Sequence, residues 1–332
     1  MKIVVDAMGG DYAPQAVIAG VIEALHELKA DIVLIGRSYD IRSELKKYQY
    51  DCARLDIIDA PEVVEMHEGA IASLRKKRNS SISLGVKLLK DKGYDAFISA
   101  GNTGAVVAAS TIHLGMLPGV ERPAIGVIIP TLKGFSFMTD MGANTEPKPE
   151  HLLQWALMAR VYVKEVMGIA NPTVGLLNIG EEEGKGTVFA QDAYKLMQDH
   201  LPSFIGNLEA NEVYTGKSDC IICDGFVGNI VLKVSEGLAE SVGTLIKREV
   251  KKSPLAMLGA FLMSPTMKHI KKKADYSEYG GAPLLGVDGL VMISHGRSSP
   301  KAIKNAIRAA EREIEHKILP IMQEEIAKEK IV

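Results

Sequence analysis

At several places in this chain a short apolar run is followed by a glycine-rich turn, and a helical run begins after such turns. In residues 95–107, DAFISAGNTGAVV, residues 96–99 have the length of a strand, residues 100–104 form a turn of small residues, and an apolar helical run begins at Ala105. Such a unit directs unpaired backbone N–H groups and the positive end of a helix dipole at one point. Glycine lets the backbone approach a ligand, and Thr103 can cap the helix or donate its hydroxyl. The stretch therefore suits an anion such as phosphate, although a tight turn that binds nothing has the same pattern.

Strand-like and helical runs alternate along most of the chain, from the apolar run at residues 3–5 to the helical run at residues 301–327. This alternation predicts an α/β fold with three layers, in which a mostly parallel sheet is covered by helices on both faces. Residues 124–130 and 135–139 are two apolar runs separated by a short turn, which predicts a hairpin and therefore a mixed sheet. We expect one α/β unit over residues 1–332, and a division into two lobes would fall near residue 145.

The composition excludes several classes of protein. Charged residues make up 24% of the 332 residues and hydrophobic residues 47%, as in globular rather than disordered chains. A formal charge of −2 and only 5% aromatic residues argue against nucleic-acid binding. Three cysteines, no signal-peptide pattern and no apolar run of about 18–20 residues predict a cytoplasmic protein without a membrane span.

Further turns of the same kind follow other predicted strands. They are residues 6–11 (DAMGGD), 180–186 (GEEEGKG), 224–229 (DGFVGN) and 279–286 (YGGAPLLG, before the last strand), with His295 and Gly296 after that strand. Ligands of such sheets bind at the carboxyl ends of the strands, so these turns together predict a shared crevice. Lys185, between two glycines, suits an oxyanion or phosphate, although a solvated charged turn has the same composition. Its spacing and the residue after it do not match a nucleoside-triphosphate-binding loop.

Metal and redox motifs are incomplete in this sequence. Cys220 and Cys223 lie within a strand-like run, where residues i and i+3 face opposite sides, so we expect buried core thiols. A zinc site would need a second pair of ligands. The GxGxxG, HExxH and GxSxG patterns are also missing. These observations predict no metal and no cofactor.

Seven motifs occur in an order that closely resembles the bacterial phosphate acyltransferases, the acyl-ACP:phosphate transacylases. They are DAMGGD, LRKKRNSS, SAGNTGA, DMGAN, NIGEEEGKG, CDGFVGNIVLK and YGGAPLLGV with SHG, between residue 1 and about residue 310. The resemblance implies an isocitrate/isopropylmalate dehydrogenase-like fold, related to the phosphotransacetylases, and a homodimer. It also implies transfer of a long-chain acyl group from acyl carrier protein to inorganic phosphate. The acyl phosphate would then feed a membrane glycerol-3-phosphate acyltransferase in phospholipid (phosphatidic acid) synthesis.

The candidate residues suit this chemistry. Phosphate is largely ionised near pH 7, with a second pKa of about 6 in its esters, and a thiolate leaves readily because its parent thiol has a pKa of about 8.5. The protein must therefore supply proximity and donors for the tetrahedral oxyanion, and no acyl-enzyme is required. We assign Lys185, Asn229 and Asp224 to catalysis. The residues assigned to phosphate or substrate binding are Asp6, Gly9, Gly10, Gly101, Asn102, Thr103, Gly104, Asn144, Gly228, Gly280, Gly281 and His295.

Two basic clusters are candidates for binding acyl carrier protein, which is strongly acidic in this family's biology. A plain solvated face has the same composition. The clusters are Arg75, Lys76, Lys77 and Arg78, and Lys268, Lys271, Lys272 and Lys273.

A short apolar helix is expected within residues 253–265, SPLAMLGAFLMSP, in a protruding segment at about residues 253–273. Its candidate membrane contacts are Leu255, Leu258, Phe261 and Leu262, since lysines flank a helix that is too short to span a bilayer. This predicts peripheral contact with the inner face of the cell membrane. A helix packed in the dimer interface or in the core has the same pattern.

Two other functions are left open by the sequence. A dehydrogenase of the same fold would need a nucleotide-binding pattern and a set of metal-binding carboxylates. A non-catalytic protein that binds acyl phosphate or acyl carrier protein would release no thiol in response to phosphate.

Overall fold

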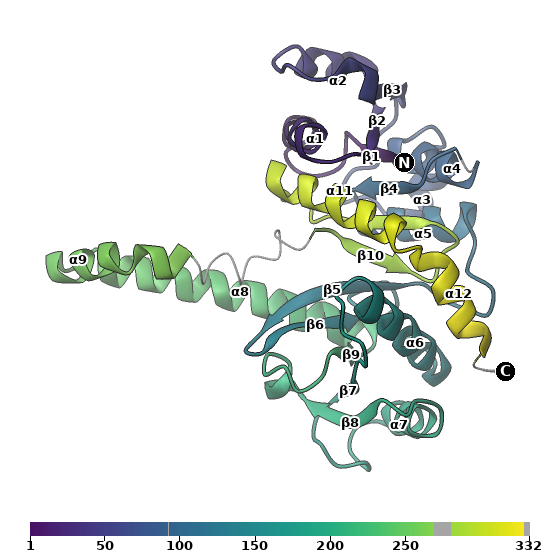
Figure 1. Ribbon diagram of the computed structural model, residues 1–332, viewed down its shortest axis with the longest axis vertical. Coiled ribbons are helices and arrows are strands. Elements are labelled where there is room, and N and C mark those ends of the chain that lie inside the picture. The colour runs from purple at the N-terminus through teal and green to yellow at the C-terminus, as the bar shows by residue number, and fades with distance from the viewer. Residues whose placement is uncertain (92, 269–279, 329–332) are drawn as a thin grey trace.

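The computed structural model describes residues 1–91, 93–268 and 280–328, and one sheet extends through this part of the chain (Figure 1). Its 11 described strands lie in the order β3-β2-β1-β4-β11-β10-β5-β6-β9-β7-β8. Their bounds are β1 Lys2–Asp6, β2 Asp31–Gly36, β3 Leu55–Asp59, β4 Ala96–Ser99, β5 Ala124–Thr131, β6 Gly134–Thr139, β7 Val174–Asn178, β8 Phe204–Glu209, β9 Cys220–Ile222, β10 Ala282–Leu285 and β11 Leu290–Ile293.

The sheet consists of two parallel parts joined by antiparallel strands. β3, β2, β1, β4 and β11 are parallel to one another, and so are β6, β9, β7 and β8. Between the two parts, β10 pairs antiparallel with β11 and β5, and β5 forms the predicted hairpin with β6. The predicted mixed, mostly parallel sheet is therefore confirmed. Because β11 pairs with β4, a strand from late in the chain completes the part of the sheet with which the chain begins.

Helices cover both faces of the sheet, as predicted. One face packs against α4, α5 and the start of α8, and the other against α1 and α11 and, further along, α6, α7 and α12. The bounds are α1 Gln15–Glu27, α2 Ser38–Leu45, α3 Ala70–Lys76, α4 Ser81–Lys90, α5 Thr103–His113, α6 Pro149–Glu165, α7 Val188–His200, α8 Gly225–Val250, α9 Pro254–Leu262, α11 Pro300–Glu315 and α12 Ile318–Lys328.

Two elements differ from the sequence prediction. Residues 282–285 form a strand rather than part of a loop, because pairing with β5 and β11 outweighs the weak local signal of small residues. The predicted single helix over residues 301–327 is two helices, α11 and α12, separated at Lys317, which has a left-handed φ of 52°. The change of direction brings Ile318 and Met322 of α12 into the core beside α6.

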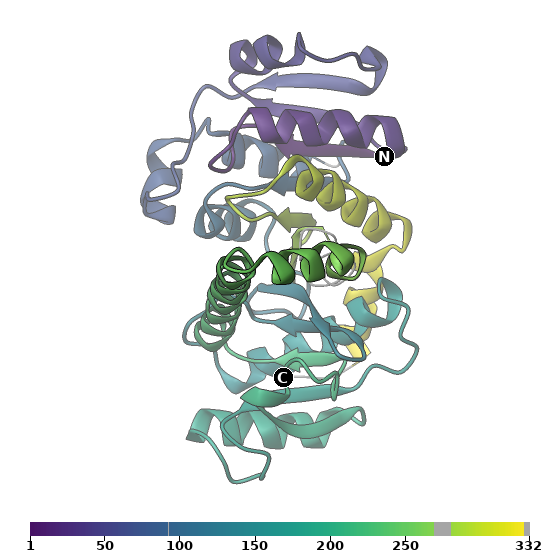
Figure 2. The ribbon, with the colours of Figure 1, turned by 90° about the vertical axis from the view of Figure 1, so that its left-hand side faces the viewer.

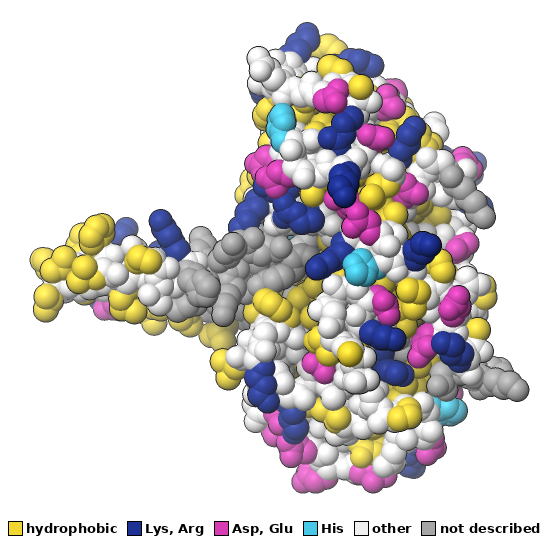
Figure 3. All heavy atoms as spheres, viewed as in Figure 1, with side chains coloured by type: hydrophobic (Ala, Val, Ile, Leu, Met, Phe, Trp, Pro, Cys, Tyr) yellow, Lys and Arg dark blue, Asp and Glu magenta, His cyan; other side chains and the backbone are white. Residues whose placement is uncertain are grey.

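Helices α8 and α9 form an arm, residues 225–262, which projects far from the body (Figure 1, Figure 2). α8 has 26 residues and is therefore about 39 Å long. α9 turns back from the outer end of α8 and diverges from it to one side (Figure 2), and it has no buried residue. Hydrophobic side chains gather over the outer end of the arm (Figure 3). The segment expected to protrude at about residues 253–273 begins within this arm, which also includes α8.

A buried carboxylic acid links α11 to α6. The hydroxyl of Tyr162 donates a hydrogen bond of 3.1 Å to Oε1 of Glu313, and both side chains are buried. Burial raises the pKa of Glu313 from its ordinary value of 4.5 to about 8. Because the folded state holds this proton more tightly than the unfolded chain, Glu313 favours folding at low pH. That contribution is lost as the pH rises through the folded-state pKa.

Replacing Glu313 with glutamine keeps an acceptor for Tyr162 and removes the titration. Between about pH 5.5 and about pH 8.5, we expect the melting temperature of the parent to fall relative to that of Glu313→Gln. Calorimetry over this range measures the difference. Glu315→Gln, at an exposed position of the same helix, serves as the control and should follow the parent. A difference between parent and Glu313→Gln that does not change with pH would contradict the prediction.

Candidate active site

A cavity of about 470 Å³ lies where the start of α5, the start of α8 and the ends of several strands meet. This volume is typical of small-molecule sites. The lining residues are Asp11, Met66, Thr103, Gly104, Ile125, Val127, Ile128, Met141, Gly142, Asn229, Leu232, Lys233, Glu236, Gly280, Gly281, Ala282, Ile293, Ser294, His295, Gly296, Arg297, Ser298 and Ala302.

The lining combines an apolar wall with polar groups. The wall comes mainly from β5, through Ile125, Val127 and Ile128, and from Leu232 of α8. Polar groups come from the start of α5, from Asn229 and Lys233 on α8, and from residues 294–298 after β11. A ligand with an apolar part and an anionic part matches this arrangement.

Two buried aspartates shape the turns beside the cavity. Asp6, at the end of β1, accepts hydrogen bonds from the Ser99 hydroxyl (2.7 Å) and the Met8 amide (3.0 Å). Asp140, after β6, accepts from four backbone amides, including that of Ile125 (3.0 Å). Burial raises the pKa of both carboxyl groups, and these hydrogen bonds oppose the shift. Their role in the structure is to fix the turn, and neither lines the cavity.

Asn102 caps α5 and also holds a neighbouring loop. Its Oδ1 accepts from the Ala105 amide (3.0 Å), so Asn102 rather than Thr103 is the N-cap. Its Nδ2 lies 3.0–3.2 Å from three carbonyl oxygens, those of residues 65, 66 and 68. This loop carries Met66 into the cavity lining. Asn102 therefore positions one wall of the cavity.

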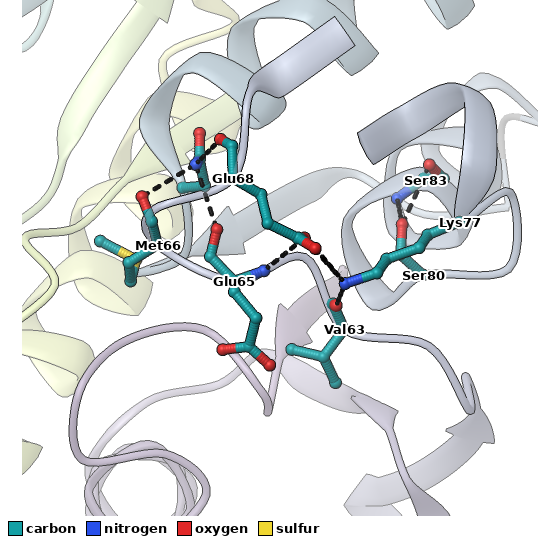
Figure 4. A network of polar contacts seen from close by, with 8 residues as sticks. Val63, Glu65, Met66, Glu68, Lys77, Ser80 and Ser83 are labelled. Atoms are coloured by element: carbon teal, nitrogen blue, oxygen red, sulfur yellow. Dashed lines mark hydrogen bonds and ion pairs between the residues drawn. The ribbon is translucent and has the colours of Figure 1, made fainter. Parts of the chain in front are cut away.

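Lys77 fixes the other end of the same loop (Figure 4). Its Nζ lies 2.8 and 2.7 Å from the two carboxylate oxygens of Glu68 and donates to the carbonyl of Val63 (2.6 Å). Lys77 is half-buried, whereas Arg75, Lys76 and Arg78 are exposed. Lys77 is therefore an ion-pair partner of Glu68, and its assignment to carrier binding stays a prediction. Of the second basic cluster, Lys268 is exposed, and Lys271, Lys272 and Lys273 lie outside the described residues.

The start of α8 brings Asn229 to the cavity. Asp224 is the N-cap and accepts from the Val227 amide (2.9 Å), so it has a structural role that the catalytic assignment did not include. Gly228 packs so closely that an added Cβ would lie 2.0 Å from the carbonyl oxygen of Asp140. Asn229 makes no side-chain hydrogen bond to any described residue, which leaves its amide available to a ligand.

Six of the predicted site residues line the cavity, and the others lie behind it or elsewhere. The six are Thr103, Gly104, Asn229, Gly280, Gly281 and His295. Behind the lining, Gly9 allows the close approach of two turns, since an added Cβ would lie 2.5 Å from the Gly101 amide nitrogen. Gly10 similarly packs on Gly296, and Asn144 donates to the Pro123 carbonyl (2.6 Å). Amides expected to hold phosphate are already bonded: those of Gly101 to Ser99 Oγ (3.0 Å) and of Asp11 to the Gly296 carbonyl (2.7 Å).

Lys185 is placed in a different loop, after β7, and is not part of this cavity. Its Nζ lies 3.9 Å from Oε1 of Glu182, and its side chain is about half exposed. Within one chain, the structure therefore does not bring Lys185 and Asn229 to the same centre.

The lining residues that the sequence analysis did not assign include four polar ones that can contact an anion: Lys233, Ser294, Arg297 and Ser298. Lys233 had a usable signal, because it lies one helical turn after Asn229 and therefore on the same face of α8. Ser294 lies in the SHG motif but was not assigned a role, and Ser298 had no signal, since the significance of both serines depends on burial. Cys220 and Cys223 are buried as predicted, and burial raises the pKa of both thiols. Among the described residues, no cluster of three histidine, cysteine or acidic side chains could hold a metal ion.

Comparison with known proteins identifies the family. A family model described as "Fatty acid synthesis protein" matches residues 1–319. A phosphate acyltransferase of Dictyoglomus thermophilum is 49% identical over 325 residues, which is 96% of this chain and 97% of the relative. The chain belongs to the phosphate acyltransferase family. A phosphate acyltransferase of Heliobacterium modesticaldum is 48% identical over 327 residues, covering 98% of each chain.

Solved structures show that this family shares its fold with phosphotransacetylases. A phosphotransacetylase from Streptococcus pyogenes aligns with a TM-score of 0.62 at 18% identity, covering 94% of each chain. A branched-chain phosphotransacylase from Enterococcus faecalis V583 aligns with a TM-score of 0.57 at 12% identity, covering 95% of this chain and 99% of that one. The predicted fold class is thereby confirmed.

Proposed function

We propose that this acyltransferase moves a long-chain acyl group from the thioester of acyl carrier protein to inorganic phosphate, within the cavity. Membership of the phosphate acyltransferase family supports transfer of an acyl group to phosphate. The proposal adds to this that the acyl donor is acyl carrier protein and that the acyl chain is long. The observation that carries it is the cavity itself, in which an apolar wall faces polar and cationic groups.

In the proposed reaction, a phosphate oxygen attacks the carbonyl carbon of the thioester. A tetrahedral oxyanion forms, the C–S bond then breaks, and the thiolate of the carrier leaves as the acyl phosphate is released. In this proposal Asn229, which lines the cavity, donates a hydrogen bond to the oxyanion. The first amides of α5, at Thr103 and Gly104, have no acceptor within the helix and would serve as further donors. No serine or cysteine nucleophile is needed, because phosphate is the nucleophile.

Thiol release from acyl carrier protein loaded with a long acyl chain tests the function. We expect release to require inorganic phosphate and to be matched by acyl phosphate, which hydroxylamine traps. Release at the same rate without phosphate would indicate a hydrolase. No release under either condition would favour a non-catalytic binding protein.

The carrier is proposed to dock on the exposed cations Arg75, Lys76 and Arg78, with Lys268, which follows the arm in the chain, contributing. Attraction between this surface and an acidic carrier weakens with salt. We expect the double variant Lys76→Glu and Arg78→Glu to raise the KM for acyl carrier protein about tenfold at low salt, with little change in melting temperature. Lys77→Met provides the contrast: it leaves Glu68 without its partner and lowers the melting temperature. A KM that responds neither to charge reversal nor to salt would exclude this docking surface.

The arm suggests how the protein assembles and where it works. Exposed apolar residues recur along α8 at intervals of four residues, at Phe226, Ile230, Val234, Leu238, Val242 and Ile246, with Leu245 beside the last of them. Such a stripe is typical of a helix that packs against another helix, and we propose that it contacts a second copy of this chain in a homodimer.

No described helix is long and apolar enough to cross a membrane. We propose that α9 instead contacts the inner surface of the cell membrane, where a glycerol-3-phosphate acyltransferase would consume the acyl phosphate.

A further inference from the structure

Two serines of the cavity have buried hydroxyl groups with no partner. Ser294 and Ser298 are only 6% and 8% exposed, and neither hydroxyl forms a hydrogen bond within the described chain. Both residues line the cavity. A buried hydroxyl without a partner destabilises the folded state, and alanine at the same place would avoid that penalty. The presence of serine at each of these positions is therefore explained if its hydroxyl forms a hydrogen bond with a bound ligand.

The backbone holds both serines in place at the cavity. The Ser294 amide donates to the Ser99 carbonyl (2.8 Å), and the Ser298 amide donates to the His295 carbonyl (2.9 Å). Gly281 leaves room beside the first hydroxyl, since an added Cβ there would lie 3.3 Å from Ser294 Oγ. Rotation about χ1 moves a serine hydroxyl among three staggered positions, so each can turn toward a bound group.

Two cations lie in the same lining. Lys233 comes from α8 and Arg297 from the loop between the two serines, and neither forms an ion pair with any described residue. Two carboxylates, Asp11 and Glu236, also line the cavity. A phosphate that retains one proton can donate a hydrogen bond to a carboxylate and accept from hydroxyl, ammonium and guanidinium groups, so this mixed set suits it better than a simple anion.

We propose that residues 294–298 and Lys233 form the phosphate subsite of the cavity, with Ser294 and Ser298 as hydroxyl donors and Lys233 and Arg297 as cations. This inference rests on the proposed function, in which phosphate is the nucleophile. It places the phosphate beside Asn229, which lies one turn from Lys233. It also gives Lys233 and Arg297 the role that the sequence assigned to Lys185.

Single variants Ser294→Ala and Ser298→Ala test the subsite. We expect each to raise the KM for inorganic phosphate about tenfold, since a hydrogen bond to a charged group is lost. The KM for the acyl donor should stay within about twofold, and the melting temperature should stay the same or rise. Lys233→Met should raise the phosphate KM similarly, and Lys233→Arg should restore part of the affinity.

Ser110→Ala is the matched control. Ser110 is also fully buried with an unpartnered hydroxyl, but it lies in α5 away from the cavity lining. Its removal should leave the phosphate KM unchanged. The proposal is wrong if Ser294→Ala and Ser298→Ala keep the parent phosphate KM, or if they lower the melting temperature and turnover without changing that KM.

Calorimetric titration with inorganic phosphate separates this inference from the proposed function. If phosphate binds the parent and binds the two serine variants more weakly, the subsite is supported. If the parent in that case releases no thiol, the proposed function is wrong while the subsite stands. Binding of equal strength in the parent and both variants overturns the subsite, whatever the turnover.

Discussion

Asn229→Ala should lower kcat by about 10²–10³-fold, which is the usual effect of removing one oxyanion donor. The side chain lies in the cavity lining, one turn from Lys233, and makes no hydrogen bond to the described protein, so its removal leaves no protein group unpaired. We therefore expect the melting temperature to stay close to that of the parent. Steady-state thiol release with saturating phosphate measures the effect. Turnover near that of the parent would exclude Asn229 from the reacting centre.

Lys185→Ala makes an informative companion, because Lys185 lies outside the cavity of its own chain. A loss comparable to that of Asn229→Ala would mean that the loop at residues 180–186 of a second subunit reaches the cavity. Turnover near that of the parent would mean that Lys185 takes no part in the reaction and that the residues lining the cavity carry it out.

The fold could be predicted because its signals are local. Apolar runs, glycine turns and helix caps are each contained within a few residues, as at Ser80, whose hydroxyl accepts from the Ser83 amide (3.3 Å) at the start of α4. β10 was missed for the opposite reason: its four residues become a strand only by pairing with β5 and β11. The break between α11 and α12 at Lys317 was likewise missed, because it depends on the packing of α12 against the core.

The candidate site was predicted less completely, because the same local pattern serves two purposes. Glycines in the turns were assigned to ligand contact, yet Gly9 and Gly228 are required by the close approach of neighbouring backbone. Lys77 looked like a free surface cation, yet Glu68, nine residues earlier in the chain, takes up its charge. Ser294 and Ser298 stand out only when their burial and missing partners are known. Such contacts are set by the tertiary structure, and residue type alone does not reveal them.

The double variant Leu258→Glu and Phe261→Glu should abolish binding to vesicles that contain anionic lipid. Leu255 and Phe261 of α9 are 78% and 73% exposed, so apolar surface is already directed away from the body. Burial of one leucine or phenylalanine side chain is worth about 1.5–3 kcal/mol, and carboxylates would add repulsion from the anionic surface. Two replacements should therefore weaken binding at least 100-fold. Co-sedimentation with vesicles measures it.

The alternative explanation of α9 is an interface between subunits, and the same variant distinguishes the two. If α9 is a membrane tip, the variant keeps its oligomeric state and its turnover in solution, because α9 contributes nothing to the cavity lining. Leu132→Glu is the control: Leu132 is highly exposed on the turn between β5 and β6, outside α9, and its replacement should leave vesicle binding unchanged. A double variant that dissociates or unfolds would instead identify α9 as part of the subunit interface. If only Leu238→Glu on α8 causes dissociation, the subunit interface is formed by the exposed apolar residues of α8, and α9 is the part that contacts the membrane.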